Sequence, residues 1–204
     1  MSSFFPMLFR MQYIRRWGLM HNLCPESLSE HALNTAILAH ALAVIGQKRL
    51  NREVRPDEVA LYAIFHDCTE IITGDLPTPV KYHNQRINSA YKEIEAAAAK
   101  TLAEMLPADL SEVYEPLLLG QSDSYTHSLV KSADKLSAYI KCLEEEKAGN
   151  TEFSAARKTI LTALKENPLP ELQIFMEEFL PAFSRTLDEL TIGQVEEKGE
   201  GYGR

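Results

Sequence analysis

Apolar residues recur at helical rather than alternating spacing along almost the whole chain, and this periodicity is the strongest constraint on its fold. No hairpin signal and no internal repeat interrupts the pattern. A chain of 204 residues is long enough to bury a core within one domain. We therefore predict an all-α fold, with a compact helical domain over residues 1–190 and a polar, glycine-rich, disordered tail over 191–204.

Capping and breaking residues mark the ends of the helices. Ser27 and Glu30 form a potential capping box, which predicts a helix over 28–46. A second helix is expected to begin at Pro56, a favourable first helical residue, and to run to a His-Asp pair near its end. The segment 73–79, which is rich in proline and glycine, predicts a loop. Further helices are predicted at 85–105, 108–119, 123–147, 152–166 and 171–190.

Composition narrows the possible partners and compartment. The formal net charge of −8 argues against binding to a nucleic-acid polymer. No long uncharged apolar stretch predicts a membrane span, and the first residues lack the apolar segment of a secretion signal. The three cysteines, Cys24, Cys68 and Cys142, show no CxxC spacing, which favours core thiols in a reducing compartment. We therefore expect a cytoplasmic protein without nucleic-acid or membrane partners.

Two histidines and two aspartates form a candidate metal site. His66 and Asp67 are adjacent, so on a helix their side chains diverge by roughly 100° and can hold an ion from two sides. Asp134 lies at the margin of the apolar face of a predicted helix, where a buried carboxylate needs a cation. Together with His31, they offer the ligands of one divalent metal and leave coordination positions for water and substrate.

Each of these residues also has an ordinary interpretation. Asp134 could be solvated and paired with Lys131 on the same helix face. His31 could be a core histidine with satisfied hydrogen bonds, and His40, within an apolar run, suits that role equally well. Spacing alone does not separate these interpretations.

Three further residues suggest a phosphate substrate. Glu70 follows Asp67 on nearly the same helix face if the helix continues that far, and there it could orient or deprotonate an attacking water. The alternative is a solvated carboxylate at a fraying helix end. Arg16 can bind a phosphate through two N–H groups, and Trp17 can close over a sugar or base. Since Trp17 is the only tryptophan, a role as a core anchor is equally open.

These residues resemble a known superfamily. The order His31, His66-Asp67, Asp134 is the H…HD…D pattern of the HD-domain metal-dependent phosphohydrolases. Five segments resemble one branch of it more closely, the bacterial YfbR-type 5′-deoxynucleotidases. These segments are 15–20, 29–31, 65–70, 73–82 and 129–134. The resemblance extends from about residue 5 to about residue 190.

The resemblance implies an HD-type helical fold with the metal site between helices. It implies a homodimer that hydrolyses deoxyribonucleoside 5′-monophosphates to deoxynucleoside and phosphate. Selectivity is expected for deoxyribose over ribose and for the 5′ position, with a broad range of bases. The implied cofactor is one divalent transition metal, and the sequence does not choose among cobalt, manganese, zinc, copper and iron.

The resemblance also assigns roles to residues. The implied metal ligands are His31, His66, Asp67 and Asp134. The implied substrate-binding residues are Arg16, Trp17, His31, Asp67, Asp75, Leu76, Pro77, Thr78, Lys81 and Asp134. Arg16 would hold the phosphate and stabilise developing charge, and Lys81 would add a second positive charge. Glu70 or Asp75 would transfer the proton, and Trp17 would press against the deoxyribose and disfavour a 2′-hydroxyl.

Two rival functions use the same residues. An HD-type phosphodiesterase acting on cyclic or oligonucleotide substrates would share the metal ligands but needs room for a second ester arm. A non-catalytic nucleotide-binding helical protein would bind nucleotide without releasing phosphate. Glu70 and Arg16 argue against the second rival, because a protein that only binds has no need of a carboxylate that activates water.

Overall fold

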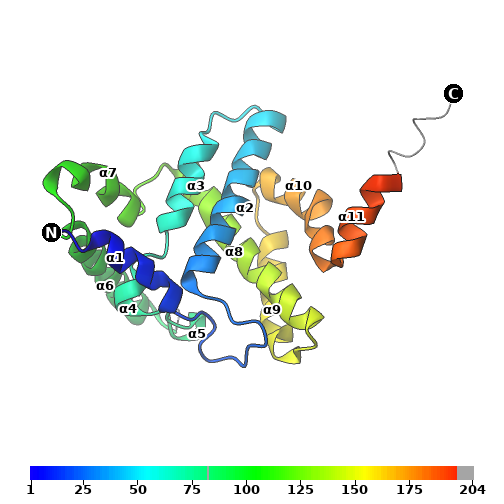
Figure 1. Ribbon diagram of the computed structural model, residues 1–204, viewed down its shortest axis with the longest axis horizontal. Helices are drawn as coiled ribbons and strands as arrows, with labels where there is room; N and C mark the ends of the chain where they lie inside the picture. Colours follow the sequence, from blue (N-terminus) through cyan, green and yellow to red (C-terminus); the bar gives the residue numbers. More distant parts are fainter. Residues whose placement is uncertain (82, 197–204) are drawn as a thin grey trace.

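The computed structural model describes residues 1–81 and 83–196. Every regular element in this part of the chain is a helix, so the predicted all-α class is confirmed (Figure 1). The elements are α1 (Phe4–Leu8), η1 (Phe9–Tyr13), α2 (Leu28–Arg49), α3 (Pro56–Phe65), α4 (Glu70–Thr73), α5 (Thr78–Lys81), α6 (Gln85–Ala103), α7 (Ala108–Leu118), α8 (Ser124–Lys147), η2 (Thr151–Phe153), α9 (Ser154–Lys165), α10 (Pro170–Glu178), η3 (Leu180–Ser184) and α11 (Leu187–Glu196).

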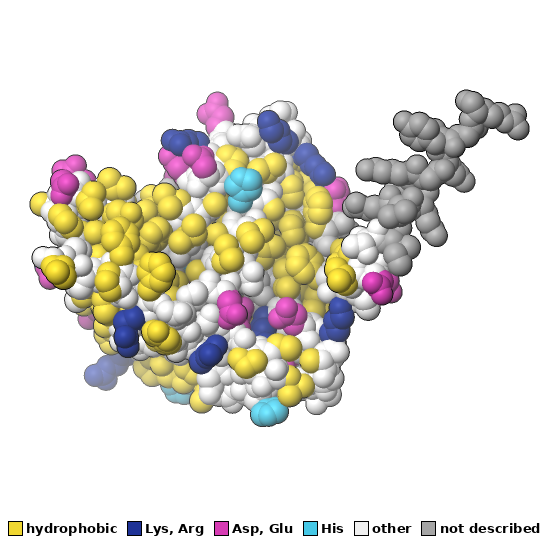
Figure 2. Space-filling view, viewed as in Figure 1, with side chains coloured by type: hydrophobic (Ala, Val, Ile, Leu, Met, Phe, Trp, Pro, Cys, Tyr) yellow, Lys and Arg dark blue, Asp and Glu magenta, His cyan; other side chains and the backbone are white. Residues whose placement is uncertain are grey.

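Helix α2 is central to the fold and begins where the sequence predicts. The Ser27 hydroxyl accepts a hydrogen bond from the Glu30 N–H, and the Glu30 carboxylate accepts one from the Ser27 N–H at 2.7 Å, so the capping box is confirmed. Helix α2 packs against both α3 and α8 (Figure 1). Part of its surface is apolar and exposed, and hydrophobic side chains gather over α2 and α3 on the face that Figure 2 draws.

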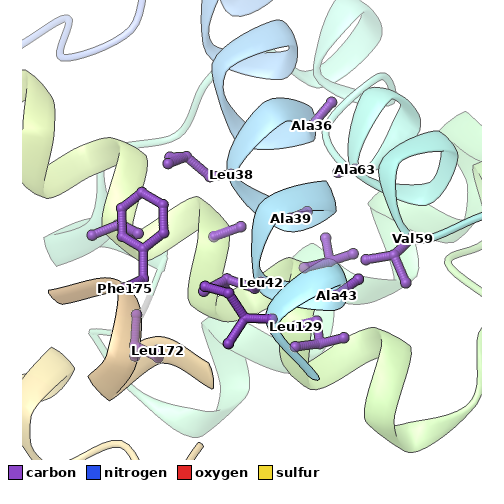
Figure 3. Close-up of a cluster of buried hydrophobic side chains, with 14 of the residues drawn as sticks. Ala36, Leu38, Ala39, Leu42, Ala43, Val59, Ala63, Leu129, Leu172 and Phe175 are labelled. Atoms are coloured by element: carbon purple, nitrogen blue, oxygen red, sulfur yellow. The ribbon is translucent and has the colours of Figure 1, made fainter. Parts of the chain in front are cut away.

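Two hydrophobic clusters form the interior. The first core lies where α2, α3, α8 and α10 meet, and Figure 3 shows Ala43 of α2 beside Val59 of α3, while Ala63 of α3 lies nearer Ala36 and Ala39 of α2. Small side chains at this contact allow the two helix axes to approach closely. The second core joins α1, α6 and α7 to the start of α2, and it contains Leu28 and Cys68. Burying each large aliphatic side chain contributes about 1.5–3 kcal/mol.

Helix α2 also meets the length and composition of a membrane span. However, 56% of its most apolar window is buried inside the protein, as expected of a helix at the centre of a helical domain. No other helix in the described ranges passes the same test.

The helix predicted to run to Asp67 is shorter than expected. Helix α3 ends at Phe65, and His66 and Asp67 lie in a turn before α4 begins at Glu70. In this turn the Cys68 N–H bonds to the Phe65 carbonyl and the Glu70 N–H to the Asp67 carbonyl, a tighter pattern than that of an α-helix. Glu70 therefore does not share a continuous helix face with Asp67.

The helix predicted at 171–190 is wrong as a single element. Helix α10 ends at Glu178 and is followed by η3 and then by α11. Pro181 explains the break, because proline lacks a backbone N–H and disfavours helical backbone at the residue before it. Helix α11 continues past the expected domain end at residue 190. The tail residues 197–204 lie outside the described residues.

The remaining predicted elements agree with the structure within a few residues. The helices predicted at 85–105, 108–119, 123–147 and 152–166 correspond to α6, α7, α8 and α9. The predicted loop is irregular from Gly74, whose φ is +74°, until α5 begins at Thr78. The short helices α1 and η1 have no counterpart among the sequence predictions.

Candidate metal centre and phosphate site

The four predicted ligands converge on one point. His31 projects from the first turn of α2 and Asp134 from α8, while His66 and Asp67 come from the turn after α3. One potential ligand atom of each lies within 4.8 Å of the others. His31 Nε2 lies 3.1 Å from Asp134 Oδ1, and His66 Nε2 lies 3.0 Å from Asp67 Oδ2. Such a group of imidazole nitrogens and carboxylate oxygens can hold one divalent metal ion.

The ring of His66 is oriented for a ligand at Nε2. Its Nδ1 lies 2.7 Å from the Ala63 carbonyl oxygen, which can only accept a hydrogen bond, so Nδ1 carries a proton. Nε2 is buried and makes no hydrogen bond of good geometry, although Asp67 Oδ2 lies 3.0 Å away. A ring held at Nδ1 by a carbonyl, with Nε2 directed at the other ligand candidates, is the usual arrangement of a metal-binding histidine. The residues present therefore fit a metal ion.

His31 is held in the same way by a neighbouring helix. It is fully buried, and its Nδ1 lies 3.3 Å from the hydroxyl of Ser137 on α8. Nε2 faces Asp134 and also Asp67 Oδ2 at 3.6 Å. His40, by contrast, is exposed on α2, and Asp134 contacts His31 rather than Lys131. The structure thus contradicts the pairing of Asp134 with Lys131 and the core role considered for His40, while the Asp134 side chain remains 41% exposed.

The negative charges among the four ligand candidates favour a bound cation. Burial raises the pKa of Asp67, but His66, His31 and Arg16 outweigh it and hold this pKa well below the usual range. Burial lowers the pKa of His66, yet the nearby carboxylates of Asp67 and Asp134 raise it to about 9. Without a metal, a proton on His66 therefore supplies the positive charge that a divalent ion can supply instead.

Arg16 lies at the edge of the four-ligand group. Its Nη1 donates a hydrogen bond to Asp67 Oδ2 at 3.4 Å, and its side chain is only 13% exposed. The backbone there is fixed, because the Arg16 N–H bonds to the Glu26 carbonyl beside an isolated antiparallel bridge between Arg15 and Ser27. The structure thus brings the predicted phosphate-binding arginine next to the predicted metal ligands.

Trp17 combines features of an anchor and of a contact residue. Its ring packs edge-on against Phe153 at a centroid distance of 5.2 Å, and its Nε1 donates a hydrogen bond to Glu26. It is nevertheless only partly buried. Its φ is +59°, a left-handed conformation that a bulky residue adopts rarely and that concentrates at functional sites. Both interpretations of Trp17 therefore have structural support.

Glu70 is buried among the charged groups of the site. Burial, followed by repulsion from Asp67 and Asp75, raises the pKa of Glu70 to about 9, although Arg16 and Lys81 oppose the shift. Its Oε2 is buried without a hydrogen-bond partner. The interpretation of Glu70 as a solvated carboxylate is therefore wrong. Asp75 contributes to this shift of the Glu70 pKa through its negative charge.

The other predicted substrate-binding residues are less directly connected to the four-ligand group. Lys81 forms an ion pair with Glu95 at 2.9 Å and lies 4.5 Å from the centroid of the Tyr91 ring. Leu76 and Pro77 are partly buried in the irregular segment before α5. Thr78 begins α5, and its side chain lies outside the described part of the chain.

The sequence does not predict two residues that contact the ligand and substrate-binding candidates and orient them. Ser137 contacts His31, and Glu26 contacts both Arg16 and Trp17. The position of Ser137 one helical turn after Asp134 is a signal that could have found it. Glu26 has no such signal, because its partners come from a separate loop.

Comparison with known proteins supports this reading of the site. A family model described as 5′-deoxynucleotidase YfbR-like matches residues 3–183. The 5′-deoxynucleotidase VP0926 of Vibrio parahaemolyticus is 47% identical over 191 residues, which cover 93% of this chain and 98% of that protein. The 5′-deoxynucleotidase yfbR of Photorhabdus temperata is 47% identical over 193 residues, covering 94% and 98%.

Solved structures show the same fold. An HD-domain phosphohydrolase of Listeria innocua, lin2634, superposes with a TM-score of 0.78 at 21% identity and covers 97% of this chain and 98% of its own. The HD phosphohydrolase DatZ of cyanophage S-2L, bound to dA and one catalytic Zn²⁺ ion, gives a TM-score of 0.64 at 20% identity, covering 89% and 96%. The fold is therefore that of the HD-domain phosphohydrolases, and the chain belongs to the 5′-deoxynucleotidase YfbR-like family.

Proposed function

We propose that this protein is a metal-dependent 5′-deoxynucleotidase, which hydrolyses deoxyribonucleoside 5′-monophosphates to deoxynucleoside and phosphate. The observation that carries the proposal is the group of four metal-ligand candidates with the buried guanidinium of Arg16 at its edge. Relatives named 5′-deoxynucleotidase that match nearly the whole chain supply the substrate class. DatZ, which has the same fold, binds dA and zinc.

His31, His66, Asp67 and Asp134 would hold the metal. A bound divalent ion supplies a Lewis acid for the phosphoryl group and lowers the pKa of water. Arg16 binds the phosphate oxygens and offsets the negative charge that develops during transfer. Glu70 or Asp75 orients the attacking water and accepts its proton. Lys81 adds a second positive charge near these carboxylates.

Selectivity for the sugar is assigned to Trp17 and to the segment before α5. The indole contacts the deoxyribose and leaves no room for a 2′-hydroxyl, while Asp75, Leu76, Pro77 and Thr78 line the rest of the substrate. Rejection of a single hydroxyl by contact alone reaches about 10–200-fold. A broad range of bases fits this arrangement, because the selective contacts involve the sugar and the phosphate.

The metal, the assembly and the compartment complete the proposal. Imidazole and carboxylate ligands suit cobalt, manganese, zinc, copper or iron.

A homodimer is supported by exposed apolar side chains, since Leu33 and Ile37 of α2 are each 60% exposed and Phe183 is 43% exposed. All three cysteines are free thiols, which agrees with a cytoplasmic location. Sedimentation velocity tests the dimer, and a monomer at micromolar concentration would contradict it.

The test of the activity is phosphate release from a panel of substrates. The panel contains deoxyribonucleoside and ribonucleoside 5′-monophosphates, 3′-monophosphates, cyclic nucleotides and bis-phosphodiesters. We expect release confined to deoxyribonucleoside 5′-monophosphates. Release from cyclic or diester substrates would favour a phosphodiesterase, and tight binding without release would favour a nucleotide-binding protein.

A further inference from the structure

Glu26 is a buried carboxylate that touches both residues assigned to substrate recognition. It directly precedes the Ser27 cap of α2 and is 8% exposed. Its backbone carbonyl accepts a hydrogen bond from the Arg16 N–H at 3.1 Å. The backbone of Glu26 is therefore joined to the short segment that carries Arg16 and Trp17.

A single oxygen of Glu26 serves both neighbours. The Trp17 Nε1–H donates a hydrogen bond to Glu26 Oε2 at 3.2 Å. Arg16 Nε lies 3.4 Å from the same oxygen and has no hydrogen-bond partner of good geometry, so this contact is an ion pair. The opposite end of the guanidinium reaches Asp67 through Nη1. Glu26 and Asp67 thus hold the Arg16 guanidinium from two sides.

Trp17 needs such support because its backbone conformation is strained. A bulky residue with a φ of +59° persists only where its surroundings fix it. The Trp17 carbonyl accepts hydrogen bonds from the Met20 N–H and from the Asn22 side chain, and its ring packs against Phe153. Glu26 supplies the hydrogen bond to the indole N–H and thereby fixes the ring.

We propose that Glu26 is a positioning residue that couples recognition of the phosphate to recognition of the sugar. This inference rests on the proposed function, in which Arg16 binds phosphate and Trp17 excludes the 2′-hydroxyl. Because one oxygen orients both side chains, a change at Glu26 affects catalytic efficiency and the deoxyribose-to-ribose ratio in separable ways.

Two substitutions separate the two contacts. Glu26→Gln keeps an oxygen that accepts from the Trp17 indole but removes the charge that faces Arg16. We expect kcat/KM for a deoxyribonucleoside 5′-monophosphate to fall about tenfold while the deoxyribose-to-ribose ratio stays unchanged. Glu26→Met has a similar length but no acceptor. It should lower kcat/KM at least as far and also lower the ratio by about tenfold.

A readout independent of activity comes from Trp17, the only tryptophan in the chain. Its fluorescence reports on one ring. We expect acrylamide to quench this fluorescence more strongly in Glu26→Met than in wild type, whereas Glu26→Gln behaves like wild type. The matched control is Glu144→Gln, because Glu144 lines the same cavity of about 320 Å³ as Glu26, and no described contact joins it to Arg16 or Trp17. This control should match wild type in every assay.

The outcomes distinguish this inference from the proposed function. If the wild type is active and the folded Glu26→Met variant keeps the normal deoxyribose-to-ribose ratio and normal quenching of Trp17 fluorescence, only this inference is overturned. If Glu26→Met does not fold, Glu26→Gln decides: an unchanged kcat/KM, or a ratio that falls together with kcat/KM, overturns the inference. A wild type that releases no phosphate from any nucleotide refutes the proposed function, and the quenching comparison then decides the role of Glu26.

Discussion

At the scale of single residues, the site depends on hydrogen bonds that fix each metal-ligand candidate from behind. The Ala63 carbonyl holds His66 through Nδ1, and the Ser137 hydroxyl lies against Nδ1 of His31. Both rings therefore turn Nε2 toward Asp67 and Asp134. Such outer contacts decide how well a ligand set binds its metal.

Replacing Ser137 by alanine tests this dependence. The Ser137→Ala variant leaves Nδ1 of His31 without its partner, and we expect metal affinity to fall by about 10–100-fold. Isothermal titration of the metal-free protein measures the change. Ser132→Ala is the control, because Ser132 is buried on the same helix and bonds to the Ser128 carbonyl and to Asn167 instead. Equal affinities in the two variants would contradict the role of Ser137.

The pH dependence of turnover tests Glu70. A proton acceptor works only when ionised, so kcat/KM should rise with pH through the pKa of Glu70. Burial and Asp67 raise that pKa to about 9 in the metal-free protein, and a bound cation lowers it from there. We therefore expect a midpoint above the usual range of a glutamate and below 9. Glu70→Gln should lower kcat by about 10²–10⁴-fold and remove this acidic limb. An unchanged limb in Glu70→Gln would assign it to another group, such as Asp75.

At the scale of elements, the loop that carries Arg16 is fastened to α8. Fully buried Glu145 accepts hydrogen bonds from the N–H groups of Leu23 and Cys24 at 3.0 Å each and from the Asn150 side chain. Lys141, one turn earlier, pairs with Glu145 at 2.5 Å and donates to the Cys24 carbonyl. This buried ion pair therefore anchors the far end of the loop.

Acid should weaken this anchor. Burial raises the pKa of Glu145, but Lys141 and the surrounding hydrogen bonds outweigh it and lower this pKa to about 2. A lowered pKa stabilises the fold above the pKa of the unfolded chain, and that stability is lost as the pH falls toward 2. We expect Glu145→Gln to be less stable at pH 7, and its deficit of at most about 3 kcal/mol to shrink as the pH falls from 5 toward 2. Urea unfolding across this range measures the deficit, and a constant deficit would contradict the assignment.

The elements also show how far sequence reasoning reaches. Local signals at Ser27, Glu30 and Pro56 predict the starts of α2 and α3 correctly, because capping chemistry acts within a few residues. The end of α3 at Phe65 is missed because no glycine or proline follows before Gly74. The break in that helix depends on tertiary packing, which local signals do not report.

The candidate site shows the same difference between what sequence patterns predict and what depends on tertiary contacts. The resemblance to the HD-domain pattern selects His31 and Asp134, which the fold brings together although they are far apart in the sequence. It does not find Glu26, because the contacts of Glu26 with Arg16 and Trp17 exist only after the loop has folded back on the start of α2.

At the scale of the whole molecule, the site lies on the boundary between the two cores. Ala63 belongs to the first core and Cys68 to the second, so the turn with His66 and Asp67 is held by packing at both ends. His31 follows Leu28 of the second core and precedes the part of α2 in the first core. A metal ion bound here would join α2, α8 and the turn after α3.

Metal binding should therefore stabilise the folded protein. A ligand that binds only the native state at a hundred times its Kd adds about 2.7 kcal/mol. For a domain of this size, this corresponds to a rise in Tm of several degrees, at about 2–4 °C per kcal/mol. Asp134→Asn, which removes one ligand charge, should lose most of the rise. Thermal scans of chelated and metal-loaded protein test this, and an equal rise in Asp134→Asn would place the metal elsewhere.

The most direct test of the central claim is metal-dependent phosphate release from one deoxyribonucleoside 5′-monophosphate. Wild-type protein is assayed after chelation and again after one equivalent of divalent metal, with Asp67→Ala as the folded control. We predict no release after chelation, restoration by the metal in wild type, and no restoration in Asp67→Ala. Full release by protein shown to be free of metal, or by Asp67→Ala, would contradict the account.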